Sequence, residues 1–367
     1  MRHRGIILIL MGGVYILCAS AQVSFALVYS GGLDHITAPS ADPGWDNVGK
    51  MMIGSGTYLG DGWVIAPYHV CERDPVGASH IDLDQRYYEI PGTARRIEYS
   101  STVDADLVMF RIAGDPGLPS VEISSSAPLA DEVTIIANGR SRVGDLVNFG
   151  GGYKGFRTTS TRAKRWGRNV TGGYVTVQSS IFGRTRALMT YFDTPGLGDD
   201  ECQPVANDSG GSVFVESSQG GSWSLAGMAL AVGTPGGYTG PNVTTHAVYG
   251  NHAYYADLSS YKDQIDEIRL IPLPGDADWD GDVDDIDIMI FQATFGQTGP
   301  DLQADFNRDE LVNLQDFAII RMHFGMVSGD GLPGAENLPV IIVPEPGTMI
   351  LLAGGLPLLL KRKRKAR

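Results

Sequence analysis

Residues 28–268 contain short apolar alternations, and this pattern most limits what the chain can fold into. Segments such as 133–136 (VTII) and 174–177 (YVTV) are typical. Glycine supplies 48 of the 367 residues, and turn signals separate the alternations at short intervals. A helical period appears only near residues 260–268. Short alternating segments bounded by turn residues predict strands joined by tight turns, so we expect an all-β sandwich or barrel.

The charge of the chain is acidic and unevenly distributed. Its formal net charge is −14, although basic residues are concentrated at both ends. A general nucleic-acid binder needs a basic face that neutralises phosphate groups. We therefore expect no nucleic-acid partner.

Each end of the chain carries an apolar segment with basic residues beside it. Arg2 and Arg4 precede an apolar run that ends at residues 19–21 (ASA), and a second small-residue site follows at 24–26 (SFA). This arrangement predicts a secretory signal peptide over residues 1–21. At the other end, residues 344–346 (PEP) precede an apolar stretch and the basic cluster 361–365.

The C-terminal order resembles the PEP-CTERM sorting signal of Gram-negative bacteria. The resemblance covers residues 343–367 and implies an exosortase-type processing enzyme and a transient membrane anchor. It also implies that the protein is secreted and resides at the cell envelope or in the extracellular matrix. The apolar stretch 348–360 would reach roughly 20 Å as a helix, which is short of a membrane core of about 30 Å. A simple tail anchor remains the alternative.

An acidic pattern recurs at a spacing of 29 residues near the C-terminal end. A Ca²⁺ ion takes six to eight oxygen ligands, and a loop that offers them at positions 1, 3, 5, 7, 9 and 12 can wrap one ion. Position 7 uses its backbone carbonyl, so its side chain is free to vary. An amphipathic segment follows each loop. The candidate ligands are Asp276, Asp278, Asp280, Asp282, Asp284 and Asp287 in loop one, and Asp305, Asn307, Asp309, Leu311, Asn313 and Asp316 in loop two.

The paired loops resemble a dockerin module, with aspartate rather than glutamate at position 12. The resemblance implies a small helical domain over residues 275–326, structural Ca²⁺ and a cohesin-like partner, with linkers at 269–274 and 327–342. Position 6 is Gly281 in loop one but Glu310 in loop two, where a positive φ is costly. We expect loop one to bind Ca²⁺ more tightly. A solvated acidic linker is the alternative.

Three separated motifs lie inside the β-rich region. His69 follows the apolar segment 62–67 (GWVIAP), and Asp106 leads into the apolar segment 107–112. Ser209 lies in the turn 207–211 (NDSGG) before another apolar segment. A serine hydroxyl is a weak nucleophile and needs an adjacent base, which a histidine oriented by a carboxylate supplies.

In this order the motifs resemble those of trypsin-like serine proteases with the chymotrypsin fold. The resemblance covers most of residues 45–268 and implies a protease domain over residues 28–268, built of two antiparallel six-stranded β-barrels. It implies an exported serine endopeptidase that hydrolyses protein or peptide substrates without a catalytic cofactor. Carried onto this chain, His69 is the base, Asp106 orients it and Ser209 is the nucleophile. The N–H groups of Asn207 and Ser209 form the oxyanion hole, and Asp208 orders that loop.

The sequence departs from the family pattern at several positions. Asn207 stands where the family has glycine, so a left-handed φ there would be strained, although asparagine tolerates it better than most residues. Residues 67–68 (PY) replace the small pair before His69. These departures keep a second function open, that of a catalytically inactive surface protein acting in adhesion or assembly through the calcium module.

Two further questions remain open from the sequence. Gln203 at the floor of the specificity pocket predicts a polar, uncharged pocket, whereas Asp200 there predicts cleavage after Lys or Arg. Secretion permits a disulfide between Cys71 and Cys202, the cysteines left after signal removal. The family's usual pairings are absent, so neither outcome is favoured.

Overall fold

The computed structural model describes residues 15–17, 25–31, 35–71, 79–194, 196–217, 220–243, 245–300 and 302–327. Most of the expected signal peptide, the second linker after residue 327 and the sorting segment 343–367 lie outside these residues. In the described residues no helix is long and apolar enough to cross a membrane.

The N-terminal part of the β-rich region forms one antiparallel sheet. An isolated bridge between Glu89 and Ile112 links the segments that follow β7 and β9, which closes six of the seven strands into a ring, with β8 paired outside it. In spatial order the strands are β7 (Arg86–Tyr88), β6 (His80–Asp82), β3 (Val48–Lys50), β4 (Ser55–Gly60), β5 (Trp63–Ala66), β9 (Val103–Arg111) and β8 (Arg95–Ser100).

The second sheet contains eight strands, and its pairing also closes. Because β11 pairs with both β10 and β12, six antiparallel strands form a ring. Strands β1 and β16 pair with β11 outside that ring. The strands of the ring, in spatial order, are β11 (Tyr153–Ser179), β10 (Glu132–Gly150), β14 (Ser212–Glu216), β15 (Trp223–Gly233), β17 (His252–Asp257) and β12 (Gly183–Tyr191).

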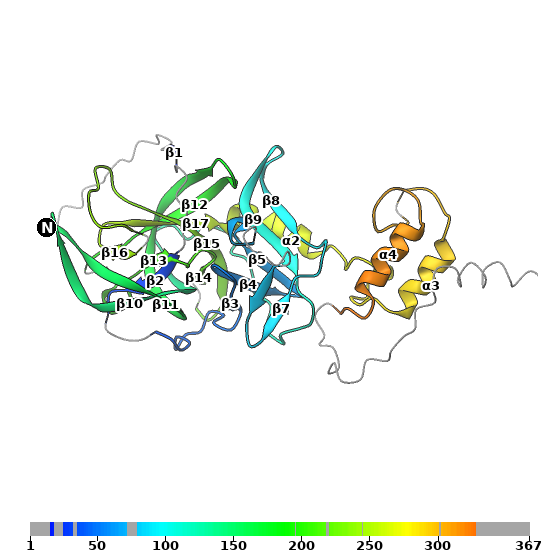
Figure 1. Ribbon diagram of the computed structural model, residues 1–367, viewed down its shortest axis with the longest axis horizontal. Coiled ribbons are helices and arrows are strands. Elements are labelled where there is room, and N and C mark those ends of the chain that lie inside the picture. Colours follow the sequence, from blue (N-terminus) through cyan, green and yellow to red (C-terminus); the bar gives the residue numbers. More distant parts are fainter. Residues whose placement is uncertain are drawn as a thin grey trace, which may run out of the picture. The chain divides into compact units, whose positions relative to one another are not determined.

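The remaining strands are short. Strand β1 (Tyr15–Leu17) runs parallel to β11, and β16 (His246–Val248) pairs with β11 near residue 156. A separate two-stranded sheet joins β2 (Phe25–Tyr29) to β13 (Cys202–Ala206), the strand that leads to Ser209. Figure 1 shows the two larger sheets, with β3–β9 in blue to cyan and the long hairpin of β10 and β11 in green.

One apolar core continues from the first sheet into the second. Leu59, Trp63 and Met109 of the first sheet belong to the same buried cluster as Phe214 and Met228 of the second. The mainly β architecture expected from the alternations is confirmed. The helical period near residue 260 forms a 3₁₀ turn (Leu258–Tyr261) and helix α2 (Lys262–Arg269).

Residues 276–327 form two similar halves, each with a loop and a helix. The helices are α3 (Asp285–Thr294) and α4 (Leu314–His323), whose N-caps are Asp284 and Asn313. Each helix begins with a capping box, in which the N-cap side chain and the N3 carboxylate accept each other's backbone N–H. The rings of Phe291 and Phe317 pack 5.3 Å apart between the helices.

Backbone pairing also connects the loop of each half to the segment after the helix of the other half. Asp282 of loop one bridges Val327 after α4, and Leu311 of loop two bridges Thr298 after α3. The left-handed residues repeat as well, because Glu310 adopts φ +63° where Gly281 has φ +97°. Loop two thus adopts the turn of loop one in spite of the Cβ of Glu310.

Candidate active site and calcium loops

His69 and Asp106 are joined by two contacts. Strand β5 ends just before Pro67, and His69 lies in the single-turn helix α1 (Tyr68–Cys71) that follows. Its Nδ1 lies 2.6 Å from Asp106 Oδ2, and its backbone N–H donates to Asp106 Oδ1 at 2.9 Å. Both residues are buried. A carboxylate at Nδ1 favours the tautomer that carries its proton there, which leaves Nε2 as a proton acceptor.

The turn between β11 and β12, together with the start of β12, supports this pair from the second sheet. The hydroxyl of Thr185 accepts the backbone N–H of Asp106 at 2.8 Å. The ring of Phe182 lies 5.6 Å from the imidazole of His69, between ring centres. Tyr68, which departs from the family pattern, packs edge-on to Phe182 and beneath the guanidinium of Arg96.

Ser209 lies in a tight turn between β13 and β14. Asn207 adopts φ +77° and Gly210 φ +81°, so the left-handed conformation expected at Asn207 is present. Neither the N–H of Asn207 nor that of Ser209 donates to any described residue. The hydroxyl of Ser209 is buried and likewise has no hydrogen-bond partner in the described part of the chain.

The first sheet contacts this turn closely. The N–H of Ser55 donates to the carbonyl of Ser209 at 2.8 Å. A Cβ on Gly54 would lie 2.3 Å from that carbonyl, and one on Gly210 would lie 1.9 Å from the carbonyl of Ser55. Glycine is therefore required at both positions for the two segments to approach.

The carboxylate of Asp208 faces the interior of its own turn. One oxygen accepts the N–H of Val205 at 3.1 Å, and the other has no partner among the described residues. Burial raises the pKa of Asp208 well above its usual range, against the opposing effects of the Val205 hydrogen bond, Arg162 and Arg165.

The structure brings His69 and Asp106 together but does not join Ser209 to them. No hydrogen bond between Ser209 Oγ and His69 is present in the described residues. Catalytic hydrogen bonds of this kind often form fully only when substrate binds.

The two candidates for the specificity pocket differ in their contacts. Asp200 is bonded to the guanidinium of Arg168, with Nε at 2.8 Å, and His35 Nε2 lies 3.5 Å from its other oxygen. The side chain of Gln203 is buried, and neither its amide nitrogen nor its amide oxygen has a partner in the described chain.

Cys71 and Cys202 form no disulfide. Cys202 is completely buried, and burial raises the pKa of its thiol well above the usual range.

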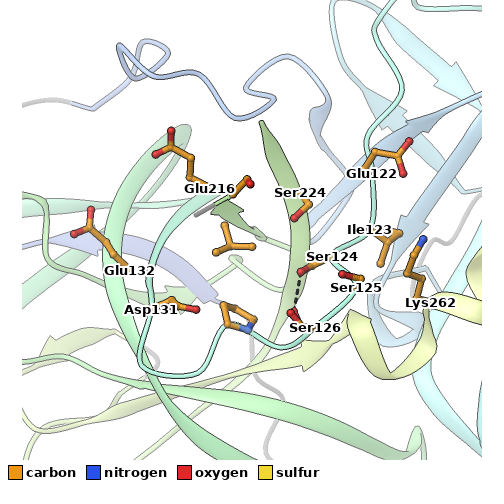
Figure 2. A pocket seen from close by; sticks show the side chains of 13 residues that line it. Glu122, Ile123, Ser124, Ser125, Ser126, Asp131, Glu132, Glu216, Ser224 and Lys262 are labelled. Atoms are coloured by element: carbon orange, nitrogen blue, oxygen red, sulfur yellow. Dashed lines mark hydrogen bonds between the residues drawn. The ribbon is translucent and has the colours of Figure 1, made fainter. Parts of the chain in front are cut away.

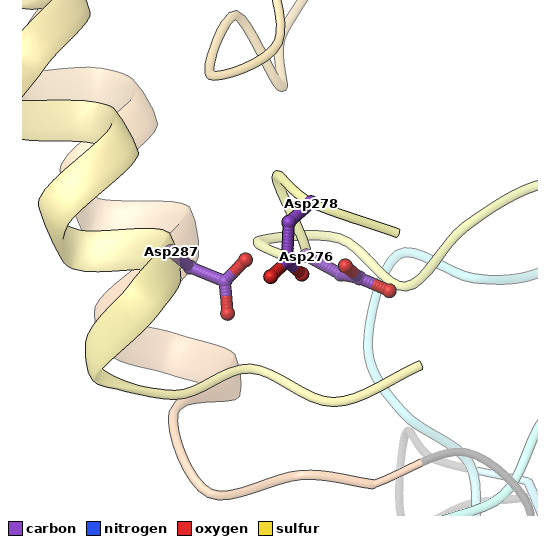
Figure 3. A group of neighbouring side chains, drawn as sticks. All are labelled: Asp276, Asp278 and Asp287. Atoms are coloured by element: carbon purple, nitrogen blue, oxygen red, sulfur yellow. The ribbon is translucent and has the colours of Figure 1, made fainter. Parts of the chain in front are cut away.

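Loop one brings carboxylates together. Oxygens of Asp276, Asp278 and Asp287 lie within 4.8 Å of one another, and Figure 3 shows Asp287 projecting from α3 towards the loop that carries Asp276 and Asp278. A second group joins Asp282 and Asp284 to Asp287. Burial, with Asp287 and Asp280 nearby, raises the pKa of Asp276 to about 6 in spite of hydrogen bonds from Gly281 and Trp279. In the described part of loop two, Asp305, Asp309 and Asp316 make no such group.

A cavity of about 740 Å³ lies elsewhere in the β-rich region. It is lined by the connection 122–132, by the end of β14 and by β15, and its charged groups include Glu122, Glu132, Glu216 and Lys262 (Figure 2). Glu216 ends β14, whereas Ser209 precedes its first residue. The cavity and the candidate catalytic residues therefore do not coincide.

Several contacts of the site could not be anticipated from the sequence. Thr185, Phe182 and Arg162 touch the pair or the segment beside the nucleophile turn, yet they lie in long strands or in the turn between them. A single threonine or arginine among alternations carries no spacing signal that would distinguish it.

Comparison with known proteins gives distant likenesses. No family model and no curated protein matches the chain. Among solved structures, the NS6 protease of murine norovirus is 13% identical with a TM-score of 0.32, covering 60% of this chain and 93% of that one. The Rv3671c protease of M. tuberculosis H37Rv, in an inactive form, is 13% identical with a TM-score of 0.34, covering 61% of this chain and 89% of that one. Likenesses of this size do not assign the chain to a family.

Proposed function

We propose that the protein is a serine endopeptidase of the trypsin-like type that acts on protein or peptide substrates. The observation that carries the proposal is the double contact between His69 and Asp106. It fixes the imidazole with Nε2 available as a base. The N–H groups of Asn207 and Ser209, which donate to no described residue, also support the proposal because they remain able to bind an oxyanion.

In the proposed reaction Ser209 Oγ attacks the carbonyl carbon of the scissile bond. His69 Nε2 takes the hydroxyl proton and then passes it to the leaving amine, while Asp106 stabilises the imidazolium. The N–H groups of Asn207 and Ser209 donate to the oxyanion, and each such donor is worth about 3 kcal/mol in the transition state. Water then hydrolyses the acyl-enzyme by the same proton transfers.

Labelling by a fluorophosphonate tests the proposal, because it requires a nucleophilic serine with its base. We expect Ser209→Ala to abolish labelling and peptide hydrolysis. Ser224→Ala removes a hydroxyl from the cavity wall and serves as the matched control, which should label normally. Equal labelling of the two variants would place the nucleophile elsewhere.

For the specificity pocket we infer a polar, uncharged floor supplied by Gln203. Its buried amide has no hydrogen-bond partner among the described residues, whereas the charge of Asp200 is compensated by Arg168. A buried amide without a partner is costly, so a substrate side chain that bonds it should be preferred. Profiling with a peptide library should show Gln203→Leu shifting the preference towards apolar residues.

We also propose structural Ca²⁺ in the two acidic loops, without a metal at the catalytic site. The convergence of Asp276, Asp278 and Asp287 supports an ion in loop one. Ca²⁺ would supply no chemistry to the reaction; its role would be to hold carboxylates that otherwise repel one another. A cohesin-like protein would be the partner of this module.

The second candidate function is an inactive surface protein that acts in adhesion or assembly through the calcium module. The buried Ser209 hydroxyl, without a bond to His69, favours it. Absence of fluorophosphonate labelling together with Ca²⁺-dependent capture of a cohesin domain would select this function.

Export and sorting complete the proposal. Cleavage after residue 21 would release the protein from its leader, and an exosortase-type enzyme would act at residues 344–346. Removing residues 344–367 should release product into the medium. If the truncated protein stays firmly bound to membranes, the tail is not the anchor.

A further inference from the structure

Asn207 is held by a contact outside its own loop. Its side-chain amide donates to the carbonyl of Ile53 at 3.0 Å, and its Oδ1 lies 3.5 Å from Nε of Arg140. Ile53 belongs to the turn between β3 and β4, which is closed by a hydrogen bond from the N–H of Met51 to the carbonyl of Gly54 at 2.9 Å. We call residues 51–54 the clamp turn. A left-handed φ at a residue with a Cβ needs such support from its surroundings.

The clamp turn is in turn held by one guanidinium from the second sheet. Arg162 of β11 donates to the carbonyls of Met52 and Gly54, each at 2.8 Å, and of Met51 at 3.3 Å. It also donates to the carbonyl of Asn138 at 2.9 Å. These acceptors are all backbone carbonyls, and three of them lie in the clamp turn.

The same turn continues into the contact with the nucleophile. Ser55, the residue after the clamp turn, donates its N–H to Ser209, and its hydroxyl accepts the N–H of Asn138 at 2.9 Å. Arg162 therefore reaches the nucleophile loop by two routes. One runs through Ile53 to the side chain of Asn207, and the other runs through Gly54 and Ser55 to the carbonyl of Ser209.

We propose that Arg162 is a positioning residue which, through the clamp turn, holds Asn207 and Ser209 with their N–H groups presented to the oxyanion. The proposal rests on the proposed endopeptidase function and deepens it. Asparagine at position 207 is then part of the device, because glycine would permit the same φ but could not reach Ile53. Burial raises the pKa of Asp208 in the same loop, and the half-buried charge of Arg162 acts in the opposite direction.

Arg142 provides a matched control in the neighbouring strand. Its guanidinium also donates to three consecutive backbone carbonyls, those of Tyr29, Ser30 and Gly31, but these lie at the end of β2 and just after it, not in the clamp turn. Arg162→Gln and Arg142→Gln thus remove equivalent guanidinium clamps at different places.

The first measurement is the rate of fluorophosphonate labelling in the full chain, with kcat and KM on a peptide substrate. We expect Arg162→Gln to lower the labelling rate and kcat at least about tenfold with little change in KM, since misplaced oxyanion donors act on the transition state. Arg142→Gln should stay within about twofold of wild type, even if both variants lose similar thermal stability. Equal losses in the two variants, or none in Arg162→Gln, would overturn the proposal.

Variants of Asn207 separate the tether from the backbone conformation. Asn207→Asp keeps a residue that tolerates left-handed φ but replaces the amide donor by an acceptor facing the carbonyl of Ile53. We expect kcat to fall at least as far in Asn207→Asp as in Arg162→Gln, and to fall less in Asn207→Gly. If Asn207→Asp retains wild-type kcat, the tether has no role.

Amide hydrogen exchange keeps the inference separate from the proposed function. In a peptide covering residues 205–211, exchange should be faster in Arg162→Gln than in wild type, and unchanged in Arg142→Gln, whether or not the protein is active. If wild type itself fails to label, the endopeptidase function is wrong, while faster exchange would still show that Arg162 holds the loop. Unchanged exchange in Arg162→Gln overturns the inference directly.

Discussion

The carboxylate of Asp106 contacts His69 twice, at the ring Nδ1 and at the backbone N–H, so that both of its oxygens serve one residue. Such a double contact fixes the backbone of the single-turn helix α1 as well as the angle of the ring. Thr185 in turn fixes the backbone of Asp106 from the second sheet. The orientation of the histidine thus depends on both sheets.

Replacement of Asp106 by asparagine should preserve the fold and lower kcat by about 10³–10⁴-fold, because an amide would favour the wrong tautomer of His69. Peptide hydrolysis with purified full-length protein measures the effect. Asp104→Asn is the control on the same strand, where the carboxylate is half-exposed and 3.6 Å from Arg96. A similar loss in both variants would argue for a general charge effect instead.

Thr185→Val should destabilise the protein by about 1–3 kcal/mol, because it leaves the buried N–H of Asp106 without an acceptor. Urea unfolding followed by fluorescence gives this value. Thr185→Ser retains the hydroxyl and should cost less. Equal stabilities of the valine and serine variants would show that this hydrogen bond contributes little.

In the calcium loops, Asp276→Ala should weaken Ca²⁺ binding more than Asp305→Ala, since loop one gathers carboxylates and has glycine at its sharp turn. We expect at least about a tenfold loss for Asp276→Ala by calorimetry. Asp285→Ala removes the same charge at a position that offers no ligand in the loop pattern, and it should change affinity little. A larger loss for Asp305→Ala would reverse the ranking.

Chelation should unfold residues 276–327 and leave the proposed protease site active, because no ligand of the loops belongs to that site. Circular dichroism and fluorophosphonate labelling of the same sample, with and without a chelator, measure the two parts. Loss of labelling on chelation would link the calcium loops to catalysis.

Lys164 makes the stability depend on pH in the alkaline range. Burial lowers the pKa of Lys164 from 10.5 to about 8. Between these values the unfolded chain binds more protons, so the free energy of unfolding should rise with pH; below pH 8 the full cost of the buried charge remains. Lys164→Met should therefore be more stable than wild type at pH 7, by on the order of 2 kcal/mol, with the difference shrinking towards pH 10.5. Denaturant titrations of both proteins at several pH values test this, and a difference independent of pH contradicts it.

The strand pattern and the order of the three motifs could be predicted from the sequence, because alternation and turn residues act locally. It also placed helix α2 within two residues of its observed start. The repeat of 29 residues predicted two similar loops, and the structure has them, with matched caps and matched left-handed turns. In each case the signal lies within about a dozen neighbouring residues.

Contacts between distant segments could not be predicted in this way. Arg162 meets the turn before β4 across more than a hundred residues of sequence, and its acceptors are carbonyls, which every residue possesses. The contact of Thr185 could not be predicted for the same reason, because its partner is a backbone N–H. The proposed preference for Gln203 over Asp200 also rests on contacts that the sequence does not show, namely the ion pair of Asp200 with Arg168 and the amide of Gln203 without a partner in the described residues.

The crossed pairing of the calcium loops has a consequence for titration. Because position 7 of each loop is bridged to the segment behind the other helix, neither loop can relax without disturbing its twin. The first ion to bind would therefore preorganise the second loop. An ion in the loop with Gly281 would stabilise the strained turn at Glu310 through the paired backbone. Saturation should be cooperative, with a Hill coefficient above one, although the two loops differ in sequence.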